Sequence, residues 1–315
     1  MAKEAAHKLK KKFRASLLLL LAAVISITTA TYAWFSLSNT TVVQDMTVQV
    51  ATSTALKART APSANLNDYA STITNEMVEG ALGFKLEELR LWPLTSGNGY
   101  NLYTQSTNSV SGASAVDPKS KNYLELKLWF MADTDMNVYL NADNSPGLTG
   151  ADADGTMVFS AGTNTSSQEP VEKCARISFT PMALRSGGSV TNASDYTVVE
   201  TPSIYEPNKD GGTTLNGNAR SQNIGSGDLQ QTFVSLGNNA GTNKGTSSET
   251  PFIFKLSRNT PKLVVIRLWI EGEDSECRNG NNGSAINIEE AKLVARLRFC
   301  GADDNGLFLE AGSGV

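Results

Sequence analysis

Apolar and polar residues alternate along several short stretches of the chain, and a period of two residues is typical of half-buried β-strands. The first such stretch covers residues 41–52, and its apolar face consists of Val42, Met46, Val48 and Val50. The same alternation recurs in residues 123–131, 174–182, 252–256 and 292–299. Residues 261–274 are almost continuously apolar, which favours a strand covered on both faces.

The turns between these stretches are rich in Gly, Asn and Asp, and no long amphipathic helix is evident. Many short strands without helices predict an all-β fold, here a jelly-roll-like β-sandwich. Residues 83–94 fit no single pattern, because Glu87 and Glu88 interrupt two apolar pairs. Residues 185–248 are dominated by Gly, Asn, Ser and Thr, so we expect a long surface excursion with one or two short strands. The segment GLFLE (306–310) is expected to close a sheet edge.

The N-terminus has the pattern of an export signal. A cluster of Lys and Arg ends at Arg14, and residues 15–35 contain no charged side chain. About 20 apolar residues are enough to span a hydrocarbon core, and the positive cluster keeps the N-terminal side in the cytoplasm. Thr31 and Ala33 place small residues at the −3 and −1 positions of a signal-peptidase site, with cleavage before Trp34. We expect residues 1–33 to be a signal peptide or, if uncut, a membrane anchor, and residues 34–315 to be an extracellular domain.

Charge and histidine content narrow the function of the exported part. Six of the 27 basic residues and one of the 31 acidic residues lie in residues 1–14, so the remainder carries a net charge of −9. An acidic domain repels phosphate backbones, which argues against a nucleic-acid partner. The single histidine, His7, lies in the leader, so Ser-His-Asp catalysis, Cys-His catalysis and HExxH zinc sites have no imidazole to use. Carboxylate chemistry remains, but no motif selects two carboxylates, and we expect no enzymatic activity.

The three cysteines, Cys174, Cys277 and Cys300, are expected to lie outside the cytoplasm, where thiols tend to pair. If residues 262–271 and 286–300 form a hairpin, Cys277 lies in its connecting loop and Cys300 lies at its far end, too distant for a direct bridge. Because Cys174 precedes a strand and can reach either end, we favour a Cys174–Cys277 disulfide with Cys300 left over. The alternative is that all three thiols are reduced, as in an anaerobic habitat.

Oxygen-rich turns recur along the chain, and calcium sites are often built from such turns. The pairs Asp133/Asp135 and Asp152/Asp154 alternate carboxylates in this way, but none of the turns matches the EF-hand loop. Asp, Asn and Gly are also ordinary turn residues. We therefore expect no cofactor and keep these four aspartates as the calcium candidates of the sequence.

The leader ends in ATYAWFSLSN (30–39), and a Val-rich strand follows at once. This junction resembles the exported TasA/camelysin group of Gram-positive bacteria, whose leaders are cut by a SipW-type signal peptidase. NYLELKLWFMADTDMNVYLN, YEPNKDGG and LVVIRLWIEGEDSEC, followed by ARLRF, resemble a set of uncharacterised surface proteins of Firmicutes.

The resemblance implies a jelly-roll-like sandwich that assembles into extracellular biofilm-matrix fibres, in which an N-terminal strand inserts into the sheet of the next subunit. The donor would be residues 34–50, with the apolar face formed by Val42, Met46, Val48 and Val50. The alternative is that residues 41–50 form the first strand of their own sandwich. Camelysin has been described as a protease, but this chain lacks histidine ligands, so that activity is not carried over.

These observations predict a non-catalytic structural protein on the cell surface, whose partners are copies of itself and the signal peptidase and which meets the membrane only through its N-terminal segment. One alternative is a membrane-tethered adhesin or glycan-binding module that presents residues 185–248 to its ligand. Another is a glycosidase, which would need two carboxylates roughly 5–10 Å apart in a cleft.

Overall fold

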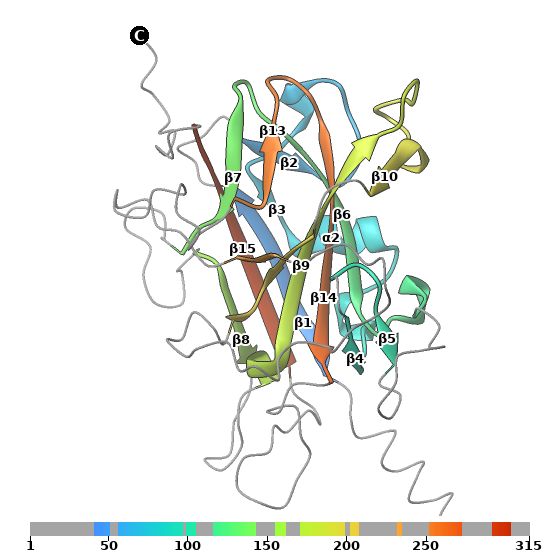
Figure 1. Cartoon of the computed structure of the whole chain (residues 1–315). Coiled ribbons are helices and arrows are strands. Elements are labelled where there is room, and N and C mark those ends of the chain that lie inside the picture. Colours follow the sequence, from blue (N-terminus) through green and yellow to red (C-terminus); the bar gives the residue numbers. More distant parts are fainter. Residues whose placement is uncertain are drawn as a thin grey trace, which may run out of the picture. The chain divides into compact units, whose positions relative to one another are not determined.

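The computed structural model describes residues 41–50, 56–96, 99–104, 116–142, 155–161, 171–198, 202–207, 232–234, 252–272 and 292–303. All of them belong to one compact unit, residues 40–315. In this part of the chain two β-sheets pack against each other around an apolar core (Figure 1). The predicted all-β sandwich is therefore confirmed.

The first sheet, sheet I, has β15 at its centre. Its strands are β1 (Val42–Val50), β3 (Thr72–Ile73), β7 (Met136–Leu140), β8 (Met157–Ala161), β13 (Phe254–Leu256) and β15 (Lys292–Ala302). One edge of β15 pairs with β8 and then β7, both antiparallel, and the other edge pairs in parallel with β1. The first and last described strands of the chain are therefore neighbours.

The second sheet, sheet II, is built around β14. Its strands are β2 (Lys57–Arg59), β4 (Pro93–Thr95), β5 (Tyr103–Thr104), β6 (Leu124–Met131), β9 (Ala175–Leu184), β10 (Tyr196–Val198), β11 (Ser203–Tyr205), β12 (Thr232–Val234) and β14 (Lys262–Glu271). β14 lies between β6 and β9 and pairs antiparallel with both. Its residues from Leu263 onward are buried on both faces, as its continuous apolar sequence predicts.

Aromatic side chains join the two sheets at the centre of the core. Phe130 of sheet II lies 5.0 Å from Phe254 and 5.1 Å from Phe299 of sheet I, measured between ring centroids. Phe179 of sheet II packs edge-on against Phe299 at 5.7 Å. All four rings are fully buried. Such pairs contribute about 0.5–1.5 kcal/mol each beyond the area they bury, so this cluster fixes how the sheets pack.

Short helices close the gaps around the sheets. They are η1 (Leu66–Asp68), α2 (Asn75–Leu82), η2 (Leu86–Glu88), η3 (Pro118–Ser120), η5 (Val171–Cys174) and η6 (Ala193–Asp195). The helix α2 contacts both β1 of sheet I and β6 of sheet II, and its Val78 enters the core. It ends at Gly83, whose φ of 77° is the left-handed conformation that glycine adopts without strain. The pair α2 and η2 therefore covers one side of the sandwich.

Several predictions need correction. The strands 262–271 and 292–302 belong to different sheets, so the hairpin considered for the cysteines does not exist. The ambiguous residues 83–94 contain η2 and β4 rather than a pair of strands, because Leu86 and Leu89 enter the core from a 3-10 turn. Phe252 lies outside β13 and is 39% exposed, so the alternation predicted for residues 252–256 holds only from Phe254 onward.

The predicted surface excursion, residues 185–248, contributes in part to sheet II. Within it the strands β10 and β11 pair antiparallel with β9, and β12 pairs in parallel with β11. These strands correspond to the two short strands predicted there and add one more, Ser203–Tyr205. The other residues of the excursion that are described include η6 and the turn at residues 185–192.

Candidate functional site

The strand predicted as the donor, β1, is a central strand of sheet I. It pairs with β15 from Val42–Lys292 to Val50–Phe299, and on its other edge it pairs with β3 at Val48–Ile73 and Gln49–Thr72. Val43, Met46, Val48 and Val50 are buried in the core. In the single chain, therefore, β1 completes its own sandwich, which is the alternative that the sequence left open.

A β-bulge changes which side chains of β1 face the core. The register against β15 shifts between Val43 and Asp45, so an extra residue lies in β1 at Gln44. As a result Val43 is fully buried, and Val42 is only half-buried. The prediction that Val42 belongs to the apolar face is wrong, whereas Met46, Val48 and Val50 are placed as predicted.

Polar contacts fix both ends and the middle of β1. The backbone N–H of Thr41 donates to Leu91 O at 3.0 Å, and Leu91 N–H donates back at 2.7 Å. Beyond the bulge, Met46 N–H donates to the side-chain oxygen of Asn75, the first residue of α2, at 2.8 Å. At the other end Val50 N–H donates to Ser71 O at 2.8 Å. The position of β1 is thus set by α2 and the residues around η2 as well as by β15.

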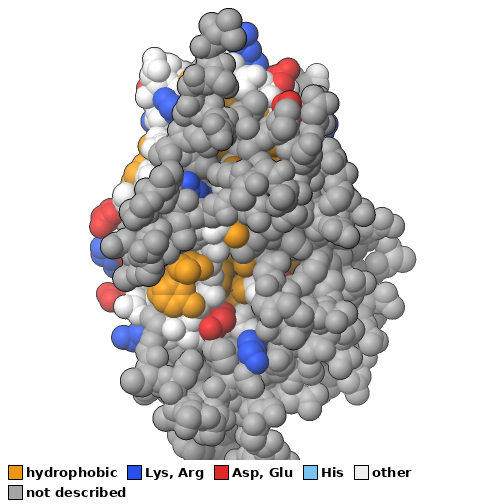
Figure 2. All heavy atoms as spheres, turned by 90° about the vertical axis from the view of Figure 1, so that its left-hand side faces the viewer, with side chains coloured by type: hydrophobic (Ala, Val, Ile, Leu, Met, Phe, Trp, Pro, Cys, Tyr) orange, Lys and Arg blue, Asp and Glu red, His pale blue; other side chains and the backbone are white. Residues whose placement is uncertain are grey.

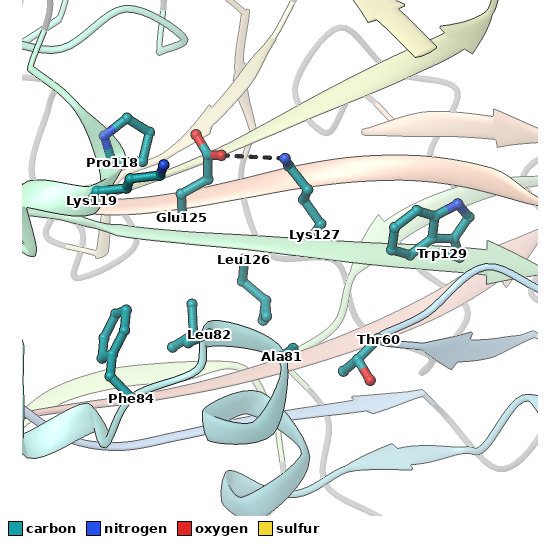
Figure 3. Close-up of a pocket in the computed structure, with 10 residues that line it drawn as sticks. All are labelled: Thr60, Ala81, Leu82, Phe84, Pro118, Lys119, Glu125, Leu126, Lys127 and Trp129. Carbon is teal, nitrogen blue, oxygen red and sulfur yellow. Dashed lines mark ion pairs between the residues drawn. The ribbon is translucent and has the colours of Figure 1, made fainter. Parts of the chain in front are cut away.

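A groove opens beside β6, between this strand and α2. We call it the β6 groove; it has a volume of about 340 Å³ and is lined by Thr60, Ala81, Leu82, Phe84, Pro118, Lys119, Glu125, Leu126, Lys127 and Trp129. Figure 3 shows Leu126 pointing toward Leu82 and Ala81, with Glu125 and Lys127 on the opposite face of β6. Its lining is therefore apolar on the α2 side and charged on the outer side.

The carboxylate of the β6 groove is held by ion pairs. Arg267 of β14 donates through Nη2 to Glu125 Oε2 at 2.7 Å, and Lys127 lies 3.8 Å from Glu125 Oε1. The guanidinium carbon of Arg267 stacks 4.1 Å from the centroid of the Tyr100 ring. Nearby, burial raises the pKa of Tyr123 to about 12, against the opposing effect of Arg267. Among the described residues, Glu125 is the acidic side chain that lines the groove.

A second buried ion pair lies on the same face of sheet II. Arg176 Nη2 is 3.0 Å from Glu206 Oε1, and the two side chains are 1% and 3% exposed. Removing one partner of such a pair leaves an uncompensated charge in the interior, so these pairs are constraints on the fold. Sequence reasoning missed both pairs. The signal was available for Arg267, because a lone charge inside an apolar strand requires a buried partner.

The other predicted site residues are partly described. Thr31, Ala33 and Trp34 of the cleavage site lie outside the described residues, as do Cys277, Asp152 and Asp154. Cys174 is fully buried, and its Sγ lies 3.5 Å from Val171 O. Because Cys277 lies outside the described residues, the Cys174–Cys277 disulfide stays a prediction. Cys300 is buried beside Tyr139 on sheet I.

The described calcium candidates do not meet in one site. Asp133 and Asp135 are exposed, and Asp135 Oδ1 accepts a hydrogen bond from Arg258 N–H at 2.7 Å, which is a turn contact. Within the described ranges no three side chains of His, Cys, Asp or Glu gather as a metal ion would require. The helices of those ranges are also too short or too polar to cross a membrane.

Figure 2 views the domain from the left-hand side of Figure 1, where β7, β8 and β15 of sheet I lie. Described apolar side chains form a small patch in the lower part of this face, next to a few charged side chains, and a few others are scattered above it. The large apolar side chains that are exposed in the described part are Met77, Leu184 and Phe252. Phe252 packs edge-on against Tyr139 at 6.5 Å and lies under the ammonium of Lys255 at 5.3 Å. Its exposure is thus partly compensated by local contacts.

The structure places the predicted donor strand, β1, between β15 and β3 of sheet I, with its apolar residues in the core. It also contains the β6 groove, which was not predicted from the sequence. Comparison with known proteins adds no identification: no family model, no curated protein and no solved structure matches this chain.

Proposed function

We propose that this chain is a non-catalytic structural subunit of the cell surface, exported by its N-terminal segment, which assembles with copies of itself by exchanging β1. One observation carries the proposal. β1 is the first described strand, it lies between β15 and the short strand β3 of sheet I, and it is joined to the next described residue, Leu56, by only residues 51–55. Removing it from its sheet therefore requires no other strand to be unthreaded.

The energetics favour exchange over loss of the strand. Val43, Met46, Val48 and Val50 are at most 3% exposed, and burying such side chains is worth about 1.5–3 kcal/mol each, or roughly 6–12 kcal/mol together. A domain that loses β1 also leaves the backbone edge of β15 unpaired. An identical strand from a second copy restores the same hydrogen bonds and the same burial. Exchange is consequently close to neutral in enthalpy, and assembly is set by concentration and by the connection at residues 51–55.

Exchange of this kind has two outcomes. Two copies that exchange reciprocally form a closed dimer, whereas a head-to-tail exchange leaves one donor and one acceptor free and grows into a filament. The leader sequence and its resemblance to the TasA/camelysin group support the filament. If cleavage occurs before Trp34, residues 34–40 are released from the membrane and β1 is free to be donated.

A cysteine lock tests the proposal. Gln49 and Thr72 are opposite residues on β1 and β3, and the first is half-buried and the second exposed, so Gln49→Cys with Thr72→Cys forms a surface disulfide. The chain that begins at Trp34, in a Cys277→Ser background, is oxidised as a dilute monomer, concentrated and examined by negative-stain electron microscopy. We expect filaments from the unlocked chain, none from the oxidised chain, and filaments again after reduction.

A matched lock controls for the added disulfide. Ala183→Cys with Thr197→Cys joins β9 and β10 at opposite residues of another antiparallel pair and leaves β1 untouched, so this variant is expected to assemble in both redox states. Filaments from the oxidised β1 lock would refute strand exchange. A chain that stays as discrete particles in every form would instead favour a tethered binding module.

A further inference from the structure

We propose that the β6 groove docks the segment Leu307–Glu310 of a second copy of the chain, which adds to sheet II as an edge strand beside β6. The contact involves sheet II and residues near the end of the sequence. It does not depend on the exchange of β1, which concerns sheet I, and either contact can fail without the other.

The backbone edge of β6 is the first argument. On one side β6 pairs with β14 from Leu124 to Phe130. On the other side it pairs with β2, and only at residues 129–131. Among the described strands none pairs with residues 124–128 on that side. An edge of this length offers N–H and C=O groups to an added strand of about five residues.

The lining of the β6 groove gives the side-chain requirements of the guest. Residues of β6 alternate, so that Leu126 faces α2 and its neighbours Glu125 and Lys127 face outward (Figure 3). A guest strand beside Leu126 therefore places every second side chain against Leu82 and Phe84. Its other side chains lie beside the outer charges of the groove.

The outer charges are positive on balance. Glu125 is neutralised by Arg267, with its Oε2 at 2.7 Å from Nη2, and both side chains are largely buried. The lining also holds two lysines, Lys119 and Lys127; Lys127 shares the Glu125 carboxylate with Arg267, at 3.8 Å from Oε1, and its side chain is 50% exposed. The groove thus selects a strand with apolar residues on one face and a carboxylate on the other.

The segment Leu307–Glu310 meets these requirements within this chain. Leu307 and Leu309 share one face of an extended strand, and Phe308 and Glu310 share the other. With the leucines against Leu82 and Phe84, Glu310 lies on the face of Lys119 and Lys127. The sequence also predicts that residues 306–310 close a sheet edge, and these residues lie outside the described ranges.

We assign the docked segment to a second copy because, within one chain, the connection from β15 to Leu307 is short. Only residues 303–306 connect Ala302, the last residue of β15, to Leu307. In Figure 1 this end of β15 lies at the upper left, whereas β6 and α2 lie on the right of the domain. The segment of a neighbouring copy is not limited by this four-residue connection to the β15 of the copy that holds the groove.

Photo-crosslinking between distinguishable copies tests this contact. A benzoylphenylalanine replaces Phe308 in an exported, isotopically light chain, which is mixed with the heavy unmodified chain and irradiated at increasing concentration. Because Phe308 shares the outer face with Glu310, we expect light–heavy crosslinks that rise with concentration and map by mass spectrometry to peptides containing Lys119, Glu125 or Lys127. Crosslinks that stay within the light chain, or that map outside the β6 groove, would overturn the proposal.

Charge reversal gives an independent readout. Lys127→Glu is expected to lower the yield of intermolecular crosslinks about two- to five-fold, as loss of an exposed ion pair does, and Glu310→Lys to lower it equally. The double variant, Lys127→Glu with Glu310→Lys, is expected to restore the yield. Lys292→Glu makes the same change at an exposed position of sheet I and leaves the yield unchanged. A double variant no better than either single variant would show that the two side chains do not meet.

Discussion

The β-bulge in β1 makes a sharp prediction about two adjacent valines. Simple alternation places Val42 in the core, whereas the register shift against β15 turns Val43 inward and leaves Val42 half-buried. Val43→Ala and Val42→Ala remove the same two methyl groups from neighbouring positions. Any difference between the two variants therefore reports burial alone.

The magnitudes follow from burial. Val43 is 0% exposed, so its truncation loses about 0.8 kcal/mol for each of two carbon atoms and leaves a cavity, or about 2–3 kcal/mol in total. Val42 already contacts solvent, and its truncation is expected to cost less than about 1 kcal/mol. For a domain of this size, a loss of 1 kcal/mol lowers the melting temperature by about 2–4 °C.

Denaturant titration of the two variants and the parent chain, followed by tryptophan fluorescence, measures the difference in the free energy of unfolding. The slopes of the three titrations should agree, because neither change alters the surface exposed on unfolding. Equal losses, or a larger loss for Val42→Ala, would show that β1 has no bulge and that the register of the first strand is wrong.

Further predictions concern the interior of both sheets. Burial raises the pKa of Tyr123 to about 12, above its usual value of about 10, so its contribution to stability is complete below about pH 10 and is lost as the pH rises toward 12. Tyrosinate absorbance should therefore show a late-ionising tyrosine that Tyr123→Phe removes, and a tyrosine that titrates near pH 10 instead would contradict this. Gly301→Ala brings a methyl group into the Met136 side chain and should cost about 1–3 kcal/mol, whereas Gly80→Ala in α2 meets open space and should stabilise by about 0.5–1 kcal/mol. Thermal unfolding compares these two variants, and equal shifts would contradict the packing around Gly301.

The fold class was predictable because strand alternation is a local property. In β6 and β15 alternation was predicted from the sequence, and one face of each strand, which includes Leu126 and Leu297, lies in the core because each strand keeps a regular period of two. The same reasoning failed at Val42 because a bulge inserts one residue, and nothing in VVQDM marks its position. Pairing partners are equally invisible, because the neighbour of β1 is a strand more than 240 residues away, at Lys292 and beyond.

The covering helix α2 was missed although its ends carry recognisable signals. Thr74 stands at its N-cap, Glu76 lies in its first turn, and Gly83 ends it with a positive φ. The helix is only eight residues long, so its single buried residue, Val78, gives no periodic pattern to detect. The β6 groove depends on this helix and was therefore beyond prediction from the sequence.

The measurement that tests strand exchange most directly is the covalent connectivity of assembled material. The chain that begins at Trp34 and carries Gln49→Cys and Thr72→Cys in the Cys277→Ser background is assembled in the reduced state, oxidised, and separated by denaturing electrophoresis without reductant. Because an exchanged β1 brings Gln49 of one copy beside Thr72 of the next, the account predicts a ladder of disulfide-linked multimers that collapses on reduction. A single monomer band from assembled material would contradict it, because each β1 would then have remained in its own sheet.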